Sequence, residues 1–187
     1  LGGYFYSETI YNAVKYAHDK GVLLIAAAGN DAISGTLYPA YFKEVIAVTA
    51  SDRNDAPASF TNFGTWIELA APGVNIYSTV LNGTYCESSG TSMSTPHVAG
   101  VAALIWSRFP TLTRDQVRIH LRKTADDLGE SGFDIYYGYG RVNAKKAVEQ
   151  NLAEHDLLIL DWKRPSYMKP GSVAINATVL NYGVNDE

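Results

Sequence analysis

The sequence predicts an α/β domain, a parallel sheet flanked by helices, followed by a shorter all-β segment. Two apolar runs, residues 22–28 and 45–49, contain almost no polar side chain, and such runs are typical of parallel strands buried on both faces. A helical pattern precedes the first run, so that helix and strand alternate as they do in α/β domains. Beyond residue 155 the apolar residues recur with a period of two and no helical pattern follows.

The first elements are a helix and three strands. Ser7 is a suitable N-cap, apolar residues follow it at helical spacing, and Gly21 supplies a C-terminal stop. The two apolar runs then form the first two strands of the sheet. A third strand candidate covers residues 66–70.

A hairpin and a buried helix come next. Asn82-Gly83 is a strong turn signal between residues 76–80 and 84–88, and it predicts a two-stranded hairpin. Small and apolar residues between positions 92 and 108 have the spacing of a helix that is buried in the domain.

Two shorter helices close the α/β part. Thr113 and Gln116 have the spacing of a capping box, which predicts a helix that extends to about Lys123. Asn143 is a suitable N-cap for a last short helix over residues 144–150. The α/β domain is therefore expected to end near residue 152.

Residues 155–187 are predicted to begin a separate β-sandwich domain that is cut short. Residues 157–160 are apolar, and alternate positions between 173 and 179 are apolar as well. Pro170-Gly171 provides a turn between these two strands. The expected organisation is thus residues 1–152 as one domain and residues 155–187 as the start of another.

The composition excludes several classes of partner. The chain of 187 residues is 47% hydrophobic and 18% charged, and its net charge of −4 includes no block of Lys or Arg. This argues against nucleic acid and anionic membranes as partners. No apolar run approaches the ~20 residues that cross a bilayer. The single cysteine, Cys86, excludes an intrachain disulfide and is predicted to be a small buried side chain. The sequence gives no indication of the oligomeric state.

The strongest chemical signal is the segment Gly-Thr-Ser-Met-Ser-Thr-Pro-His-Val-Ala-Gly, residues 90–100. A glycine before Ser92 permits a tight turn, and a helix that begins at Ser92 places its hydroxyl and N–H at the positive end of the helix dipole. Such a serine suits attack on a carbonyl group, with its own N–H donating to the oxyanion that forms. The purely structural alternative is a serine that only caps the N-terminus of a buried helix.

Residues 90–97 resemble the active-serine signature of the subtilisin-like proteases, the subtilases, in which Ser92 would be the nucleophile. Ala27-Ala28-Gly29-Asn30 resembles the segment that supplies the oxyanion-hole asparagine of that family. Leu1-Gly2-Gly3 is similar to its substrate-binding strand. Further matching segments follow in the family's order, at residues 71–73 and 138–144. The resemblance extends from residue 1 to about residue 152.

The resemblance implies a serine endopeptidase that cleaves polypeptides. Asn30 and the N–H of Ser92 would stabilise the tetrahedral intermediate. The residues implied as lining the substrate groove and the primary specificity pocket are Leu1, Gly2, Gly3, Ala28 and Gly29. Leu37 falls where the family shapes the floor of this pocket, and a leucine there implies a shallower apolar pocket than a glycine would.

The catalytic triad is incomplete in this sequence. A subtilase also needs an aspartate and a histidine general base, and the family carries them upstream, the histidine in a His-Gly-Thr segment. Neither motif occurs here. His97 follows Ser92 by five residues, at a position where the family keeps a packing histidine. Leu1-Gly2-Gly3 is neither an initiator Met nor a signal peptide, so the chain is expected to be an internal fragment that is inactive alone.

Further properties follow from the resemblance. The chemistry requires no cofactor, and the metal ligands stay unknown, although the family often holds structural calcium through loop carbonyls, for which residues 40–45 are the candidate segment. Residues 169–183 resemble the opening of a CARDB-like (cell-adhesion-related) β-sandwich. Such an appendage, with the family, implies an extracellular or cell-surface protein.

Two other functions remain open. A peptide ligase or exopeptidase on the same scaffold would have insertions that block the groove or exclude water. A pseudoprotease, or a surface-binding module that retains the subtilase scaffold, would lack the upstream Asp or His. Ser92 and Asn30 together favour the protease, because a binding scaffold needs neither.

Overall fold

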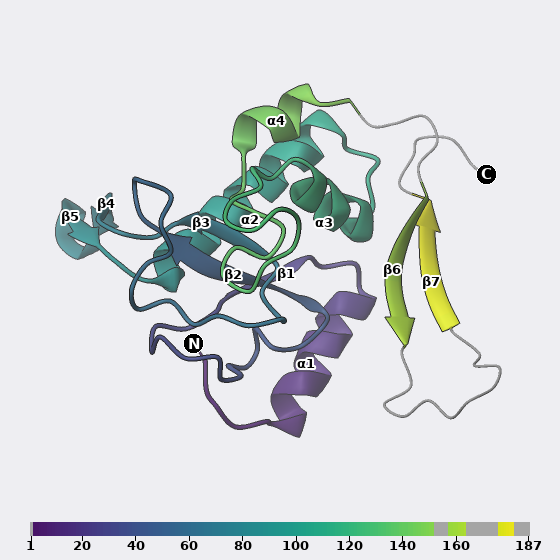
Figure 1. The fold of residues 1–187 in the computed structure, drawn as a ribbon, viewed down its shortest axis with the longest axis horizontal. Coiled ribbons are helices and arrows are strands. Elements are labelled where there is room, and N and C mark those ends of the chain that lie inside the picture. Colours follow the sequence, from purple (N-terminus) through teal and green to yellow (C-terminus); the bar gives the residue numbers. More distant parts are fainter. Residues whose placement is uncertain (1, 152–156, 164–175, 182–187) are drawn as a thin grey trace. The chain divides into compact units, whose positions relative to one another are not determined.

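The computed structural model describes residues 2–151, 157–163 and 176–181 (Figure 1). The chain divides into two compact units, Leu1–Glu149 and Gln150–Glu187. None of the helices in the described ranges is long and apolar enough to cross a membrane.

The core of the first unit is a three-stranded parallel sheet in the order β1-β2-β3. The strands are β1 (Leu24–Ala27), β2 (Val45–Ser51) and β3 (Leu69–Pro72). Helix α2 (Thr91–Arg108) contacts all three strands, and α1 (Glu8–Asp19) contacts β1 (Figure 1). The predicted fold class, a parallel sheet flanked by helices, is confirmed.

The strands differ in burial according to their place in the sheet. Every residue of the central strand β2 is buried, as predicted for a strand covered on both faces. All four residues of β1 are only half-buried, so the prediction of full burial for residues 22–28 is wrong. Within the described residues β1 is an edge strand, with β2 as its one neighbour in the sheet. The third strand begins at Leu69, three residues later than predicted.

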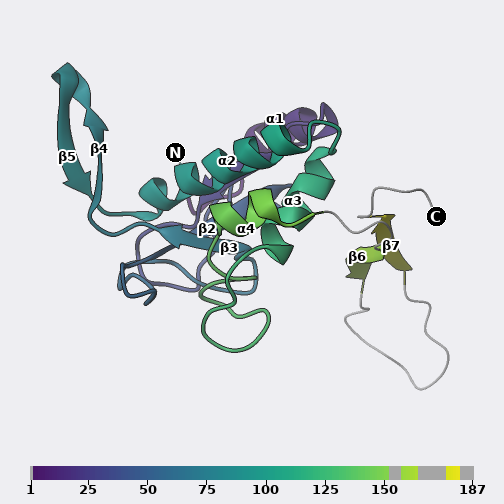
Figure 2. The same ribbon diagram turned by 90° about the horizontal axis from the view of Figure 1, so that it is seen from above.

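The predicted hairpin is confirmed. Its strands are β4 (Ile76–Val80) and β5 (Thr84–Ser88), which pair antiparallel around the short 3-10 turn η1 (Leu81–Gly83). Asn82 and Gly83 both have positive φ, 65° and 68°, as the turn chemistry of Asn-Gly requires. Figure 2 shows that the hairpin projects away from the sheet and the helices.

The helix caps that the sequence predicts are present in the structure. Ser7 caps α1, and the hydroxyl of Thr113 and the side chain of Gln116 complete the capping box of α3 (Arg114–Lys123). The side chain of Asn143 accepts from the N–H of Lys146 at 2.9 Å in α4 (Ala144–Glu149). Both α3 and α4 contact α2 (Figure 2).

A buried ion pair ties α3 to the sheet. Glu68, only 5% exposed, directly precedes β3 and accepts from Arg118 Nε at 2.7 Å and from Arg122 Nε at 2.8 Å. Burial alone would raise the pKa of the Glu68 carboxyl, but the two guanidinium charges overcome it and hold this pKa below its usual value. Arg118 also donates to the carbonyls of Lys43 and Val45, at 2.9 and 3.3 Å.

A second charged cluster fixes the segment before α4. The Asp126 carboxylate accepts from Arg141 Nη2 at 2.7 Å and from Asn143 Nδ2 at 3.0 Å, and it pairs with Lys146 Nζ at 2.7 Å. Burial opposes ionisation, but these donors outweigh it and lower the pKa of Asp126 to about 2 from 3.8. The N–H and carbonyl groups of Asp126 and Arg141 also pair with each other.

The second unit contains an antiparallel pair, β6 (Leu157–Lys163) and β7 (Asn176–Asn181). The strand expected at residues 157–160 is confirmed as part of β6. The turn expected at Pro170-Gly171 and the first half of the second expected strand lie outside the described residues. The β-sandwich identity of this unit stays a prediction.

Removal of the Glu68 charge should destabilise the first unit strongly. Glu68→Gln keeps the size of the side chain but leaves two half-buried guanidinium groups without this counter-charge, so the free energy of unfolding should fall by about 3 kcal/mol. The matched control is Asp19→Asn, which removes the exposed i,i+4 pair with Lys15 and should change stability little. Chemical denaturation of both variants measures this, and equal effects would contradict the structural role of Glu68.

The Asp126 cluster should make stability depend on pH in the acid range. Its folded-state pKa of about 2 lies below the unfolded value of 3.8, so the ionised carboxylate stabilises the fold above pH ~4 and this contribution is lost as the pH falls toward ~2. Asp126→Asn should cost about 1 kcal/mol at pH 6, and the difference from wild type should shrink between pH 5 and pH 3. A difference that stays constant in denaturation curves over this range would contradict the assignment.

Candidate active site

Ser92 is the second residue of α2 and is exposed. The residue before the helix, Gly90, has a φ of 155°, a backbone conformation that favours glycine. Its N–H donates to the carbonyl of Gly73 at 2.8 Å, which fixes the turn into the helix. The first N–H groups of a helix lack partners inside the helix. Ser92 therefore combines an accessible hydroxyl with a position where the helix dipole favours negative charge.

Asn30 lies three residues after β1, and Thr91 orients its side chain. The Asn30 Oδ1 accepts from the N–H and from the hydroxyl of Thr91, both at 2.9 Å. Two donors on the oxygen fix which way the amide points. The NH2 end of Asn30 is therefore the end left to donate to a substrate oxygen, beside Ser92 in the same pocket.

Thr91 joins the end of β1 to the start of α2. Its fully buried hydroxyl accepts from the N–H of Gly29 at 3.1 Å while it donates to Asn30. No role for Thr91 was expected from the sequence, although its place next to Ser92 in the serine motif was a signal that could have identified it.

Asn62 fixes the same loop from the other side. Its fully buried side chain donates to the carbonyl of Ala28 at 3.0 Å and accepts from the N–H groups of Asp31 and Ile33 at 2.9 and 3.3 Å. A Cβ on Gly29 would lie 2.4 Å from Asn62 Nδ2, so only glycine fits there. Sequence reasoning missed Asn62, since one asparagine in an irregular loop carries no signal of these contacts.

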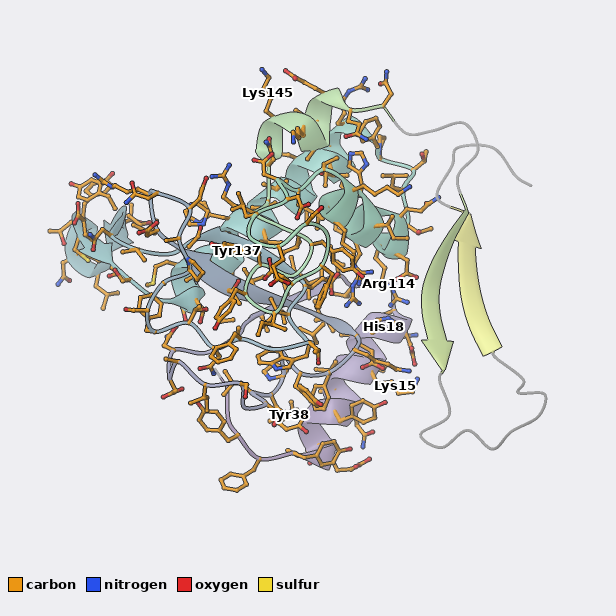
Figure 3. All side chains as sticks on the ribbon, viewed as in Figure 1. Lys15, His18, Tyr38, Arg114, Tyr137 and Lys145 are labelled. Atoms are coloured by element: carbon orange, nitrogen blue, oxygen red, sulfur yellow. The ribbon has the colours of Figure 1, made fainter. Side chains whose placement is uncertain are left out.

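The strand-like segment before α1 forms one wall of the pocket. Gly3 pairs with Tyr38 through two backbone hydrogen bonds, at 3.0 and 2.9 Å. Tyr38 lies beside α1 (Figure 3) and its ring packs edge-on against Tyr6 and Tyr41 and at a tilt against Phe42. These aromatic contacts hold the glycine segment in place.

The side chain of Leu37 lies between Gly2 and Gly29. Its Cδ2 atom is 3.1 Å from the point where a Cβ on Gly2 would lie and 3.0 Å from the corresponding point on Gly29. A methyl group thus occupies the space that the two glycines leave open. This placement fits a pocket floor formed by an apolar side chain.

Most of the predicted site residues surround one pocket of about 780 Å³. Ser92, Asn30, Gly2, Gly29 and Leu37 line it. Three predicted residues do not line this pocket. Ala28 is fully buried, and Gly3 holds the pocket wall through its backbone hydrogen bonds to Tyr38. Leu1 lies outside the described residues.

A second hollow of about 420 Å³ adjoins Ser92 on the side of the hairpin. Both strands β4 and β5 contribute to it, together with Ser92, Met93 and His97. Ser92 lines both hollows. A peptide bound across Ser92 would therefore have space on both sides of the carbonyl group that the serine would attack.

Among the described residues no hydrogen bond joins a histidine to Ser92. His97 lines the second hollow with Ser92, but its ring is exposed and its Nδ1 pairs with the carbonyl of Met93 at 2.8 Å, within the same helix. His18 pairs with Asp19, and the buried His120 pairs with the carbonyl of Ala147. His155 lies outside the described residues.

Cys86 is exposed, which overturns the prediction of a small buried side chain. It lies on β5, and the projecting hairpin buries no residue of that strand. The spacing to Ser92 in the sequence gave no measure of burial, because Cys86 lies on the hairpin whereas Ser92 begins the helix that packs on the sheet.

Two carbonyls of the candidate calcium segment, residues 40–45, already accept hydrogen bonds. Arg118 donates its guanidinium N–H groups to the carbonyls of Lys43 and Val45, and its positive charge would repel a second cation beside them. Within the described ranges no group of three or more His, Cys, Asp or Glu side chains could hold a metal.

Comparison with known proteins agrees with this geometry. The family model described as "Subtilase family" matches residues 1–140. Subtilisin DY of Bacillus licheniformis is 46% identical over 153 residues, which cover 80% of this chain and 55% of that protein. Thermitase of Thermoactinomyces vulgaris is 45% identical over 149 residues, 80% of this chain and 52% of that protein.

A third relative, described as a thermophilic serine proteinase of Bacillus sp. (strain AK1), is 46% identical over 148 residues, 79% of this chain and 36% of that protein. The chain thus spans about half or less of the length of these curated relatives. Since the family model covers most of the chain and the Ser92 and Asn30 segments lie inside it, the chain belongs to the subtilase family.

Proposed function

We propose that the protein containing this chain is a serine endopeptidase in which Ser92 is the nucleophile and Asn30 is an oxyanion-hole donor. The observation that carries this proposal is the pair of hydrogen bonds from Thr91 to Asn30 Oδ1, both 2.9 Å. They leave the amide NH2 to donate beside Ser92. A turn asparagine or a capping serine would have no use for this arrangement.

The proposed reaction is acyl transfer. The Ser92 hydroxyl attacks the carbonyl carbon of the peptide bond while a general base takes its proton, and the negative charge that develops on the oxygen is held by Asn30 NH2 and the N–H of Ser92. The amine then leaves with a proton from the same base. Water, activated by the base, releases the acyl group and restores the serine.

The general base belongs outside the described residues of this chain. Each described histidine has another partner or an exposed position, and the His-Gly-Thr motif is absent from the sequence. A serine without a base is a weak nucleophile, so this chain alone should not hydrolyse peptides. The proposed chemistry needs no cofactor, and a structural calcium at residues 40–45 stays a proposal that rests on the family.

The remaining proposals concern the rest of the protein. Residues 1–152 form the C-terminal part of the catalytic domain, and residues 155–187 begin a CARDB-like β-sandwich. The substrate is a polypeptide, and the location is extracellular or at the cell surface. These proposals rest on the family and on the strand pattern after residue 155.

One observation favours a second candidate, a pseudoprotease that only binds peptides. No hydrogen bond joins a described histidine to Ser92, as would hold if the whole protein lacked a base. The two candidates differ in covalent reactivity, because a fluorophosphonate labels a serine only when a base activates it.

The first test of the proposal is covalent labelling of the full-length protein. Fluorophosphonate should label Ser92, and Ser92→Ala should abolish both labelling and peptide cleavage. Asn30→Ala should keep labelling measurable but lower kcat by about 10²–10³, the known effect of losing this donor in subtilisin, a relative in the same family. A wild-type protein that is folded and unlabelled would favour the pseudoprotease.

The second test concerns Leu37 as the floor of the pocket. Leu37→Gly removes the side chain that lies between Gly2 and Gly29, so the pocket should deepen. The kcat/KM for peptides with Phe or Tyr before the cleaved bond should rise relative to peptides with Ala by about 10-fold or more, since a better-buried large apolar side chain gains at least ~1.4 kcal/mol. Leu112→Ala, a buried substitution far from the pocket, is the control for general loosening. An unchanged Phe-to-Ala ratio in Leu37→Gly would contradict the floor assignment.

A further inference from the structure

The loop that carries Asn30 is open to solvent. Residues 30–34 are all exposed and lie outside the helices and strands, directly after the buried pair Ala28 and Gly29. Ala32 has a φ of 55°, a conformation that is unfavourable for a residue with a Cβ and persists only where the surroundings enforce it. The loop is therefore kept in one conformation by specific contacts and not by burial.

Hydrogen bonds to Asn62 hold the backbone on both sides of Asn30. Before Asn30, Asn62 Nδ2 donates to the carbonyl of Ala28 at 3.0 Å, and the N–H of Asn62 donates to the carbonyl of Gly29, also at 3.0 Å. After Asn30, the Oδ1 of Asn62 accepts from two N–H groups, at 2.9 and 3.3 Å, of which the first belongs to Asp31. One residue thus fixes the chain before and after the proposed oxyanion donor.

Asn62 is in turn anchored to the sheet. Its side chain is fully buried, and the hydroxyl of Thr61 accepts from the N–H of Ala50 in β2 and donates to the carbonyl of Asn62, both at 3.2 Å. The carbonyl of Phe60 accepts from the N–H of Ala32 at 2.8 Å. A short series of hydrogen bonds therefore ties the Asn30 loop to the central strand.

Thr91 and Asn62 fix different parts of Asn30. The two hydrogen bonds from Thr91 orient the side-chain amide, whereas the bonds to Asn62 fix the backbone from which that side chain extends. An oxyanion donor has to lie about 2.7–3.1 Å from the oxygen that gains charge. A displacement of about 1 Å can cost roughly 10²-fold in rate, so the backbone position matters as much as the direction of the amide.

We propose that Asn62 is a positioning residue for catalysis, which holds the Asn30 amide at the place where the oxyanion forms. This inference rests on the proposed peptidase function and adds a residue to its machinery. Asn62 is not among the residues that line the Ser92 pocket. Its effect therefore passes through Asn30 and belongs to the transition state, whereas a purely structural asparagine would affect stability alone.

The main test is Asn62→Ala in the full-length protein, with kcat expressed per active site titrated with fluorophosphonate. The kcat should fall about 10-fold, less than in Asn30→Ala, because the donor is displaced and not removed. The KM should stay within about 2-fold, because the donor interacts with the transition state and not with the bound substrate. A raised KM with an unchanged kcat would overturn the proposal.

A double-mutant cycle shows whether Asn62 acts through Asn30. In an Asn30→Ala background the amide is already absent, so that addition of Asn62→Ala should lower kcat by less than about 2-fold more. Losses that multiply would mean that Asn62 affects the reaction independently of Asn30, and the positioning role would be wrong.

The matched control for general loosening is Thr124→Val. This substitution removes a buried hydroxyl that donates to the carbonyl of His120 at 2.7 Å and does not line the Ser92 pocket. It should lower stability and leave kcat unchanged. If Thr124→Val lowers kcat as much as Asn62→Ala does, the loss reflects loosening of the fold and the proposal fails.

Two measurements keep the test valid if Asn62→Ala does not fold. Asn62→Leu fills the same space without any hydrogen-bonding atom and should lower kcat about 10-fold as well. In the wild type, the N–H groups of Asp31 and Ile33 should exchange slowly with deuterium although their loop is exposed, because Asn62 accepts from both. Rapid exchange of these two groups would contradict the restraint itself.

The outcomes also distinguish this inference from the function on which it rests. A wild-type protein that cleaves peptides, with a folded Asn62→Ala variant at the wild-type kcat, overturns the positioning role and leaves the peptidase standing. A folded wild-type protein that neither cleaves peptides nor is labelled at Ser92 by fluorophosphonate overturns the peptidase itself.

Discussion

The candidate site depends on hydrogen bonds that join the end of β1 to the start of α2. Parallel strands end at one edge of their sheet, and helices begin there, so this edge collects loop side chains and helix N-termini. In this chain Thr91 links the two elements at this edge, because its hydroxyl accepts from the N–H of Gly29 and donates to the side chain of Asn30. Without that bridge, the amide of Asn30 would have no fixed orientation.

The bridge is effective because both sides of it are rigid. Asn62 holds the carbonyl of Ala28 and the next N–H groups of the Asn30 loop, and α2 is packed on the sheet through Val98 and Ile105, both fully buried. A donor that is already oriented before the reaction needs no reorganisation when charge develops. The packing of α2 thus contributes to the chemistry as well as to stability.

The sequence was sufficient where a local pattern determines structure. The caps at Ser7 and Thr113, the Asn82-Gly83 turn and the central strand follow from interactions within a few residues, and the structure has them. The fold class followed from the same patterns. The pocket residues could be proposed only through the resemblance to a family, since the spacing from Gly2 to Leu37 and Ser92 carries no physical signal of contact.

The failures have a common cause, which is separation along the chain. Thr91 and Asn30 are 61 residues apart and Arg118 and Glu68 are 50 apart, so no window of sequence shows that they meet. Cys86 was expected to be a small buried side chain. Burial depends on the packed surface around a residue, and the projecting hairpin leaves Cys86 beside an open hollow.

The distribution of functional groups explains what this chain can do without the rest of the protein. It carries the proposed nucleophile Ser92, the proposed oxyanion donors and the pocket that Ser92 and Asn30 line, all built from one sheet edge and one helix. Among the described residues no hydrogen bond joins a histidine to Ser92, and a serine hydroxyl keeps its proton near neutral pH unless a base removes it. Under the proposed function, binding of a peptide and polarisation of its carbonyl would therefore belong to this part of the structure, and turnover would need a base from outside the described residues.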